Sequence, residues 1–226
     1  MLDQNRSRNP PPAAAVTVAL LIIDVQTALT TGKWEVFQSR QTIERINRVS
    51  RLVRNAGAPV VVIQHEEAQG PMQHGSAGWQ LDAKLDVEPS DIRLRKTASD
   101  AFHKTDLQAL LHAQGITTLI ACGLQSEMCV DSTIRRALAL GFPVTLVSDA
   151  HSTMDNSVLT ASQISAHSNV TLSSLDSYGP RVSVVPTAEL QLTTESLESI
   201  VQPGWLRRPW LLSLGLRIES RPVPLT

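Results

Sequence analysis

Cys129 is the residue of this chain whose type and position point most directly to covalent chemistry. It lies in the segment Gly123–Val130, where an apolar, strand-like run gives way to a helical pattern. A thiol at a helix N-terminus lies near unpaired backbone N–H groups, whose partial positive charge favours the thiolate. We therefore predict a nucleophilic sulfur near neutral pH. The alternative is that Cys129 is a small buried hydrophobic residue, the usual role of an intracellular cysteine.

Two charged residues follow predicted strands and could assist such a sulfur. Asp24 ends the apolar run Val18–Ile23, and Lys96 follows the short segment Asp91–Arg95. Ligands of open α/β sheets bind outside the carboxyl ends of the strands, so we expect these side chains to meet there with Cys129. An aspartate can take the thiol proton, and an ammonium group favours the charged forms of both partners. Taken singly, Asp24 could equally cap a loop and Lys96 could be a surface cation.

The elements that must position these residues alternate along the chain between buried strands and amphipathic helices. The predicted strands are Val16–Ile23, Val60–Ile63, Asp91–Arg95, Thr117–Ala121, Val144–Val147 and Val182–Val185. The predicted helices are Thr42–Ala56, one opened by the capping-box sequence Thr105–Gln108, one from Cys129 to Leu140, and Leu159–His167. This alternation predicts right-handed crossovers and a doubly wound, mainly parallel six-stranded sheet of the α/β class.

Three segments depart from this alternation. Residues 65–91 are rich in glycine and proline, so we expect an irregular loop of the kind that often binds ligands. Residues 1–14 are polar and proline-rich, which predicts a disordered leader before a single domain at 15–192. Residues 193–226 form a predicted C-terminal tail with Trp205 and Trp210, which either packs on a partner subunit or lacks order.

Composition narrows the class of partner. The chain has 226 residues and a formal net charge of −1, with its lysines and arginines scattered. This pattern offers no basic patch for nucleic acid or an anionic membrane surface. The apolar runs are also shorter than the roughly 20 residues needed to cross a bilayer. The two cysteines, Cys122 and Cys129, are not a disulfide framework. We expect a cytoplasmic protein that acts on a small molecule, without a nucleic-acid or membrane partner.

Four sequence blocks, in this order, resemble the isochorismatase-like cysteine hydrolases, the superfamily that includes nicotinamidases. The blocks are Leu21–Gln26, Lys96–Phe102 with Thr105–Leu107, Cys122–Thr133, and Ser148–Thr153. The resemblance implies a three-layer α/β/α sandwich, a homo-oligomer, and a catalytic set of Asp24, Lys96 and Cys129 that hydrolyses a C–N bond. It also implies an oxyanion hole made by the amides of Gln125 and Cys129, with a cis peptide bond between Leu124 and Gln125.

The chemistry of these residue types agrees with that implication. Asp24 would accept the thiol proton, the sulfur would attack an amide carbonyl, and backbone N–H groups would hold the oxyanion. Water would then cleave the thioester, with the Asp24 carboxyl group donating a proton in one step and accepting one in the next. We predict a small-molecule amide as substrate and leave its identity open.

Substrate-binding residues are expected in the loops around this set. We predict His65, Trp79 and Leu124, because pockets are lined by apolar and aromatic side chains with a few polar groups. Nicotinamidases carry an Asp-x-His metal pair in this region, whereas this chain has Gln64-His65-Glu66-Glu67 followed by His74. A metal site needs three or four converging ligands, so we expect no metal and no other cofactor.

Two other functions fit the same resemblance. One is vinyl-ether hydrolysis of the isochorismatase type, which proceeds by acid–base chemistry and needs no thiol. The other is a non-catalytic family member that serves as a binding subunit. The presence of Cys129 argues against the first, and the presence of Asp24, Lys96 and Cys129 together argues against the second.

Overall fold

The computed structural model describes residues 17–192, in which six parallel strands form one sheet. The strands are β1 (Val18–Ile23), β2 (Val60–His65), β3 (Ile92–Lys96), β4 (Thr118–Leu124), β5 (Val144–Ser152) and β6 (Val182–Val185). Their order is β3-β2-β1-β4-β5-β6, and every neighbouring pair is parallel. The prediction of a doubly wound parallel sheet of six strands is confirmed.

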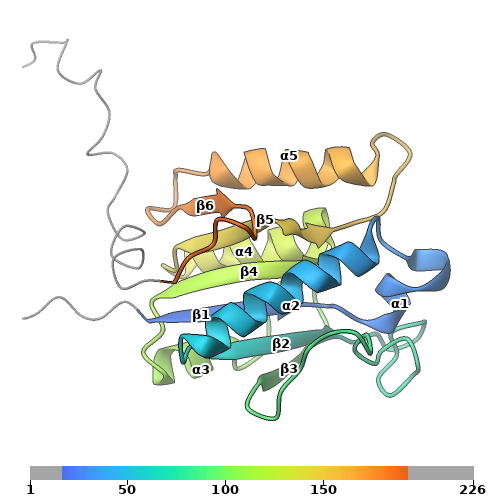
Figure 1. Cartoon of the computed structure of the whole chain (residues 1–226), viewed down its shortest axis with the longest axis horizontal. Coiled ribbons are helices and arrows are strands. Elements are labelled where there is room, and N and C mark those ends of the chain that lie inside the picture. The colour runs from blue at the N-terminus through green and yellow to red at the C-terminus, as the bar shows by residue number, and fades with distance from the viewer. Residues whose placement is uncertain (1–16, 193–226) are drawn as a thin grey trace, which may run out of the picture.

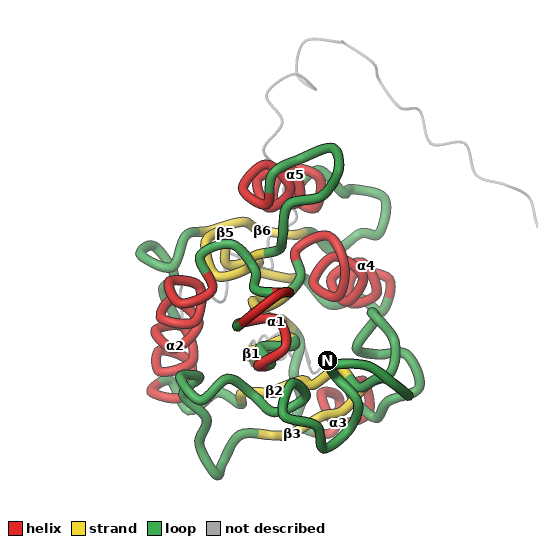
Figure 2. Tube along the Cα trace, turned by 90° about the vertical axis from the view of Figure 1, so that its right-hand side faces the viewer, coloured by secondary structure: helices red, strands yellow, loops and turns green. Residues whose placement is uncertain are grey.

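Helices cover both faces of this sheet. They are α1 (Thr27–Thr30), α2 (Ser39–Asn55), α3 (Leu107–Ala113), α4 (Asp131–Ala139) and α5 (Ala161–Ser173), with short turns η1 (Gly32–Trp34) and η2 (Ser126–Val130). Figure 1 shows α2 across one face, α3 and α4 behind the sheet, and α5 beside β5 and β6. The end-on view in Figure 2 shows the same layers, with α2 and α4 on opposite sides of the strands. The chain therefore has the three-layer α/β/α arrangement that the resemblance implied.

The sequence of β1 explains these layers. Successive side chains of a strand point to opposite faces, and all six residues of β1 are buried. Leu21 and Ile23 belong to the core that α3 and α4 complete, whereas Leu20 and Ile22 belong to the core that α2 completes. A strand covered on both faces needs apolar residues at every position, so the run shows no polar alternation.

Two helix starts differ from the prediction. Thr105 does not form a capping box at α3, because the helix begins at Leu107 with Asp106 as its N-cap; the Thr105 hydroxyl donates to the Ala101 carbonyl at 2.6 Å and accepts from the Leu107 N–H at 3.4 Å. A capping box forms instead at Thr160 and Gln163, at the start of α5. Helix α5 also continues to Ser173, beyond the predicted end at His167. Both sites carry the same sequence signal, but α5 begins directly after Thr160, whereas α3 begins two residues after Thr105.

The order of the strands reverses at the centre of the sheet. From β1 the sheet is extended toward one edge by β2 and β3, and toward the other edge by β4, β5 and β6. The strands β1 and β4 therefore flank the crevice in which such folds bind ligands. Gly123 pairs with Ile23 at the carboxyl end of these two strands. Its φ is +122°, and a Cβ there would lie 2.1 Å from the Ile23 carbonyl oxygen. Only glycine allows β4 to approach β1 this closely.

The predicted irregular loop is also observed. Between β2 and β3 the backbone forms only isolated bridges, Gln26 with Leu81 and Glu67 with Gln73. The predicted leader at 1–14 and the tail at 193–226 lie outside the described residues. None of the helices in the described part of the chain is both long enough and apolar enough to cross a bilayer.

Candidate active site

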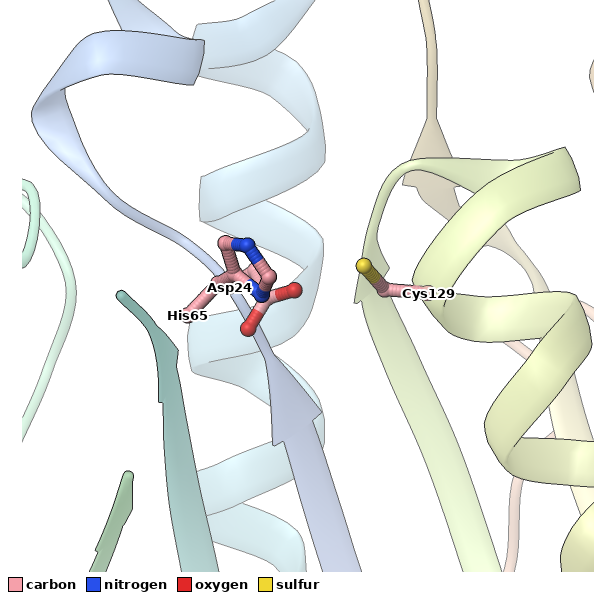
Figure 3. A group of neighbouring side chains, drawn as sticks. All are labelled: Asp24, His65 and Cys129. Atoms are coloured by element: carbon pink, nitrogen blue, oxygen red, sulfur yellow. The ribbon is translucent and has the colours of Figure 1, made fainter. Parts of the chain in front are cut away.

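The carboxyl ends of four strands bring the predicted catalytic residues together. Asp24 directly follows β1, His65 and Lys96 are the last residues of β2 and β3, and Cys129 lies in the turn η2 after β4. A carboxylate oxygen of Asp24, a ring nitrogen of His65 and the sulfur of Cys129 all lie within 4.8 Å of one another. The Cys129 sulfur points toward the Asp24 carboxylate and the His65 ring (Figure 3). Asp24 has a φ of +52°, a left-handed backbone conformation that is uncommon for residues other than glycine.

Lys96 is held by three acceptors inside the protein. Its Nζ lies 2.7 Å from Asp24 Oδ2, 3.0 Å from the Ala98 carbonyl oxygen and 3.3 Å from His65 Nδ1. The Lys96 side chain is 0% exposed and the Asp24 side chain 1%. A buried ion pair is tolerated only when the remaining polar groups are satisfied, and an ammonium group has three N–H donors. All three donors of Lys96 are used, so this cation has one fixed position.

This arrangement determines the tautomer of His65. A lysine ammonium can only donate, so His65 Nδ1 must accept and the ring hydrogen must be on Nε2. Burial and the neighbouring charge of Lys96 lower the pKa of His65, which keeps the ring neutral at neutral pH. The Ala98 backbone carbonyl also interacts with the ring and opposes part of this lowering of the pKa.

The protonation state of Cys129 differs from the sequence-based expectation of a thiolate near neutral pH. Burial, and to a lesser extent the Asp24 carboxylate, raise the pKa of the Cys129 thiol to about 12, while Lys96 opposes this rise. The cost of removing a thiolate from water exceeds the favourable charge of Lys96 and of the helix start. The free protein therefore holds a neutral thiol that needs a base. Asp24 Oδ1 is buried without a hydrogen-bond partner in the described part of the chain, so it is available to accept the thiol proton.

Cys129 lies in a single π-helical turn rather than at the first residue of an α-helix. The carbonyl of Gln125 accepts hydrogen bonds from the N–H groups of Met128 and Val130, at 3.1 and 3.2 Å, and α4 begins only at Asp131. The peptide bond between Leu124 and Gln125 is cis, as the resemblance implied. The hydrogen bonds to the Gln125 carbonyl form this turn, which places the backbone of Gln125 and Cys129 at the end of β4.

Gln26 is a residue of this site that sequence reasoning missed. Its side chain is fully buried, and its amide nitrogen donates to the carbonyls of His65 and Trp79, both at 2.9 Å. Its amide oxygen accepts from the His65 N–H at 2.8 Å. Gln26 therefore joins the ends of β1 and β2 to the irregular loop. The signal was a polar amide two residues after Asp24, next to an otherwise apolar strand.

The other predicted substrate-binding residues occupy different surroundings. Trp79 is half-buried, its ring contacts that of His74 with centroids 4.6 Å apart, and its indole N–H has no partner among the described residues. Leu124 is 1% exposed and packs in a small apolar cluster with Leu29 and Val36. The structure places the Trp79 ring within the loop and buries the Leu124 side chain.

Asp24, His65 and Cys129 offer the oxygen, nitrogen and sulfur atoms that a transition metal could bind. The neutral ring of His65 has one lone pair, however, and Nδ1 uses it to accept from Lys96. Lys96 also binds one of the two Asp24 carboxylate oxygens and brings a positive charge to the same place. With the Lys96 ammonium in place, these three residues do not make a complete donor set for a metal ion.

Comparison with known proteins places the chain in a family. Residues 18–173 match the isochorismatase domain. A streptothricin hydrolase from Streptomyces noursei is 42% identical over 138 residues, covering 61% of this chain and 50% of that protein. A ureidoacrylate amidohydrolase from Caulobacter segnis is 26% identical over 178 residues, covering 62% of this chain and 74% of that protein.

A solved structure agrees with the sequence match. An isochorismatase from Pseudomonas putida KT2440 has a TM-score of 0.72 and 28% identity, covering 81% of this chain and 95% of that one. The matches to the two streptothricin hydrolases span only 50% and 59% of their lengths. The domain match nevertheless covers more than half of the 226 residues, and the chain therefore belongs to the isochorismatase family.

Proposed function

We propose that this protein is a cysteine hydrolase that cleaves the C–N bond of a small-molecule amide through a thioester on Cys129. The observation that carries the proposal is the position of the Cys129 thiol beside a buried carboxylate whose Oδ1 has no partner, while Oδ2 is held by Lys96. A protonated thiol beside an available base is the arrangement of an activated nucleophile.

The first half of the reaction forms the acyl-enzyme. Asp24 takes the thiol proton as the Cys129 sulfur attacks the amide carbonyl, and the backbone N–H groups of Gln125 and Cys129 bind the resulting oxyanion. Collapse of this intermediate breaks the C–N bond. The Asp24 carboxyl group returns its proton to the leaving nitrogen, so ammonia or an amine departs and a thioester remains.

The second half restores the enzyme. Asp24 takes a proton from a water molecule, whose oxygen attacks the thioester carbonyl and forms a second oxyanion at the same N–H groups. Collapse releases the carboxylic acid, and the proton on Asp24 returns to the Cys129 sulfur. Lys96 keeps the carboxylate in place through both halves because its three donors fix its position.

The substrate amide is proposed to bind between the His65 ring and the Trp79 loop. The buried link through Gln26 holds the His65 backbone and the Trp79 carbonyl in fixed positions. The names of the relatives support an amide-type substrate, since one acts on streptothricin and another is an amidohydrolase of ureidoacrylate. Streptothricin, ureidoacrylate and simple cyclic amides are the first compounds to test.

The test combines product detection with identification of the acylated residue. The purified protein is mixed with each amide, ammonia or amine release is measured, and the trapped intermediate is located by peptide mass spectrometry. We expect an adduct on Cys129 and loss of turnover in Cys129→Ala. The matched control is Cys122→Ala, which removes the fully buried second thiol and should still form the adduct.

Two results would contradict the proposal. One is an adduct on any residue other than Cys129. The other is a Cys129→Ala variant that retains amide turnover, because a thioester on Cys129 would then be unnecessary.

A further inference from the structure

A second series of buried polar side chains contacts the nucleophile turn, η2 (Ser126–Val130), from the opposite side of β4. Ser126, the first residue of η2, is 0% exposed, and its Oγ lies 2.8 Å from His151 Nδ1. His151 Nε2 lies 2.9 Å from Asn169 Oδ1, and Asn169 Nδ2 donates to the Ser148 carbonyl at 3.1 Å. These contacts connect α5 and β5 to the turn that contains Cys129.

The position of each polar hydrogen in this series of side chains follows from the contacts. Because Asn169 Nδ2 donates to a carbonyl, its Oδ1 faces His151 and must accept, so His151 carries its hydrogen on Nε2. Burial lowers the pKa of His151, and a neutral ring then presents Nδ1 as an acceptor. The Ser126 hydroxyl therefore donates to His151 Nδ1.

Ser165 of α5 also contacts Ser126, although it lies outside the series from Asn169 to Ser126. Its Oγ lies 2.9 Å from Ser126 Oγ, and since the only Ser126 hydrogen is used by His151, the Ser165 hydroxyl is the donor in this pair. Both ring nitrogens of His151 are occupied, and its side chain is 4% exposed. His151 therefore has no free nitrogen with which to serve as a second base.

We propose that the series Asn169, His151 and Ser126 positions the nucleophile turn, so that the backbone N–H groups of Gln125 and Cys129 face the oxyanion. Ser126 is directly bonded to Gln125 and lies three residues before Cys129, so its side chain anchors the turn from inside the protein. The proposal rests on the amide hydrolysis proposed above. His151 acts through Ser126 and is a positioning residue.

The proposal predicts a dependence on the charge of His151. An imidazolium carries hydrogen on both nitrogens, so Nδ1 would face the Ser126 hydroxyl with a donor and the series would break. Two acidic residues of the described chain lie on the elements that carry His151 and Ser126, β5 and η2. Asp149 precedes it on β5 and pairs with Arg45 of α2 at 3.4 Å, and Glu127 of η2 accepts from Thr153. From α5, Asn169 and Ser165 face the series, and both are uncharged.

The first experiment changes that charge through Asn169. In Asn169→Asp a carboxylate replaces the amide oxygen, which stabilises the imidazolium and raises the pKa of His151. We expect the acidic limb of the kcat profile to move up by about one pH unit or more, with KM unchanged. Asn169→Ala, like Asn169→Asp, loses the hydrogen bond to the Ser148 carbonyl but adds no charge, so the acidic limb of its kcat profile should not move upward. Val170→Asp adds an exposed carboxylate next in sequence and should match the wild type.

The second experiment compares two serines of the same network. Ser126→Ala removes the donor to His151, and kcat should fall about tenfold or more, since loss of oxyanion alignment is costly. Ser165→Ala leaves the series from Asn169 to Ser126 intact and should retain most of kcat. His151→Asn keeps an acceptor for Ser126 and should be more active than His151→Leu at equal thermal stability. Equal kcat in the two serine variants, or an unmoved acidic limb in Asn169→Asp, would overturn the proposal.

Two readouts separate this proposal from the proposed function. The ¹⁵N chemical shifts of His151 report its tautomer directly, and alkylation of Cys129 by iodoacetamide reports the geometry of the turn. Should the wild type hydrolyse no amide, an Nε2–H tautomer and a changed alkylation rate in Ser126→Ala would still support the positioning role. An Nδ1–H tautomer, or equal alkylation rates in Ser126→Ala and the wild type, would refute it whatever the activity.

Discussion

The ammonium of Lys96 lies 2.7 Å from Asp24 Oδ2, and neither side chain is more than 1% exposed. Removing one member of such a pair leaves an uncompensated charge inside the protein, whereas removing both does not. This relationship makes Lys96 and Asp24 dependent on each other for stability as well as for the proposed chemistry.

Lys96→Met should lower the free energy of unfolding by about 3–5 kcal/mol, because the Asp24 carboxylate would remain buried without its cation. The double variant Asp24→Asn with Lys96→Met should recover most of that loss. Urea denaturation at neutral pH measures both. Equal losses in the single and double variants would show that the charge pair does not determine stability at this position. Neither variant should hydrolyse an amide.

The Cys129 thiol should react slowly with iodoacetamide at neutral pH. Its pKa is raised to about 12 by burial, so the alkylation rate should increase continuously from pH 7 to pH 10 and show no plateau. Peptide mass spectrometry after timed quenching gives the rate at Cys129. A plateau near neutral pH would mean that the resting sulfur is already a thiolate, as the helix-terminus argument alone predicted.

Acidic conditions should destabilise the protein through His65 and His151. Both histidines have a lowered pKa in the folded state, so between that value and about 6.5 the unfolded chain binds more protons. The free energy of unfolding therefore falls as the pH drops below about 6.5, and is constant again below the folded-state pKa. Denaturation at a series of pH values tests this. His151→Asn should show a smaller slope, and an equal slope would assign the effect to other groups.

Gly123→Ala should be far more disruptive than the same change at Gly57. Both glycines have positive φ, which costs an alanine about 1–2 kcal/mol. A Cβ at Gly57 meets nothing within 4 Å, whereas at Gly123 it would lie 2.1 Å from the Ile23 carbonyl oxygen. We expect a loss of about 3 kcal/mol or more at Gly123. Turnover should also fall, because β1 and β4 must move apart and would carry Asp24 and Cys129 away from each other. Thermal denaturation and amide turnover of the two variants provide the comparison.

Local sequence determined most of the architecture. The apolar runs at Val18–Ile23 and Val60–Ile63 lie within strands covered on both faces, and helical periodicity located α2. These features depend on the spacing of apolar side chains along the chain, which the local sequence specifies. The order of Asp24, Lys96 and Cys129 along the chain also indicated one site, because parallel strands end at the same edge of a sheet.

Tertiary structure alone decided the electrostatics and the supporting contacts of that site. The burial that raises the pKa of Cys129 comes from segments distant in sequence, and so do two of the acceptors of Lys96, Asp24 and His65. The links of Gln26 to His65 and of His151 to Ser126 also join distant segments. Spacing along the chain reports which residues end a strand, but desolvation and hydrogen-bond direction depend on what packs around them in three dimensions. The sequence by itself therefore identified the residues able to carry the chemistry, and the folded structure determined which of them hold a proton.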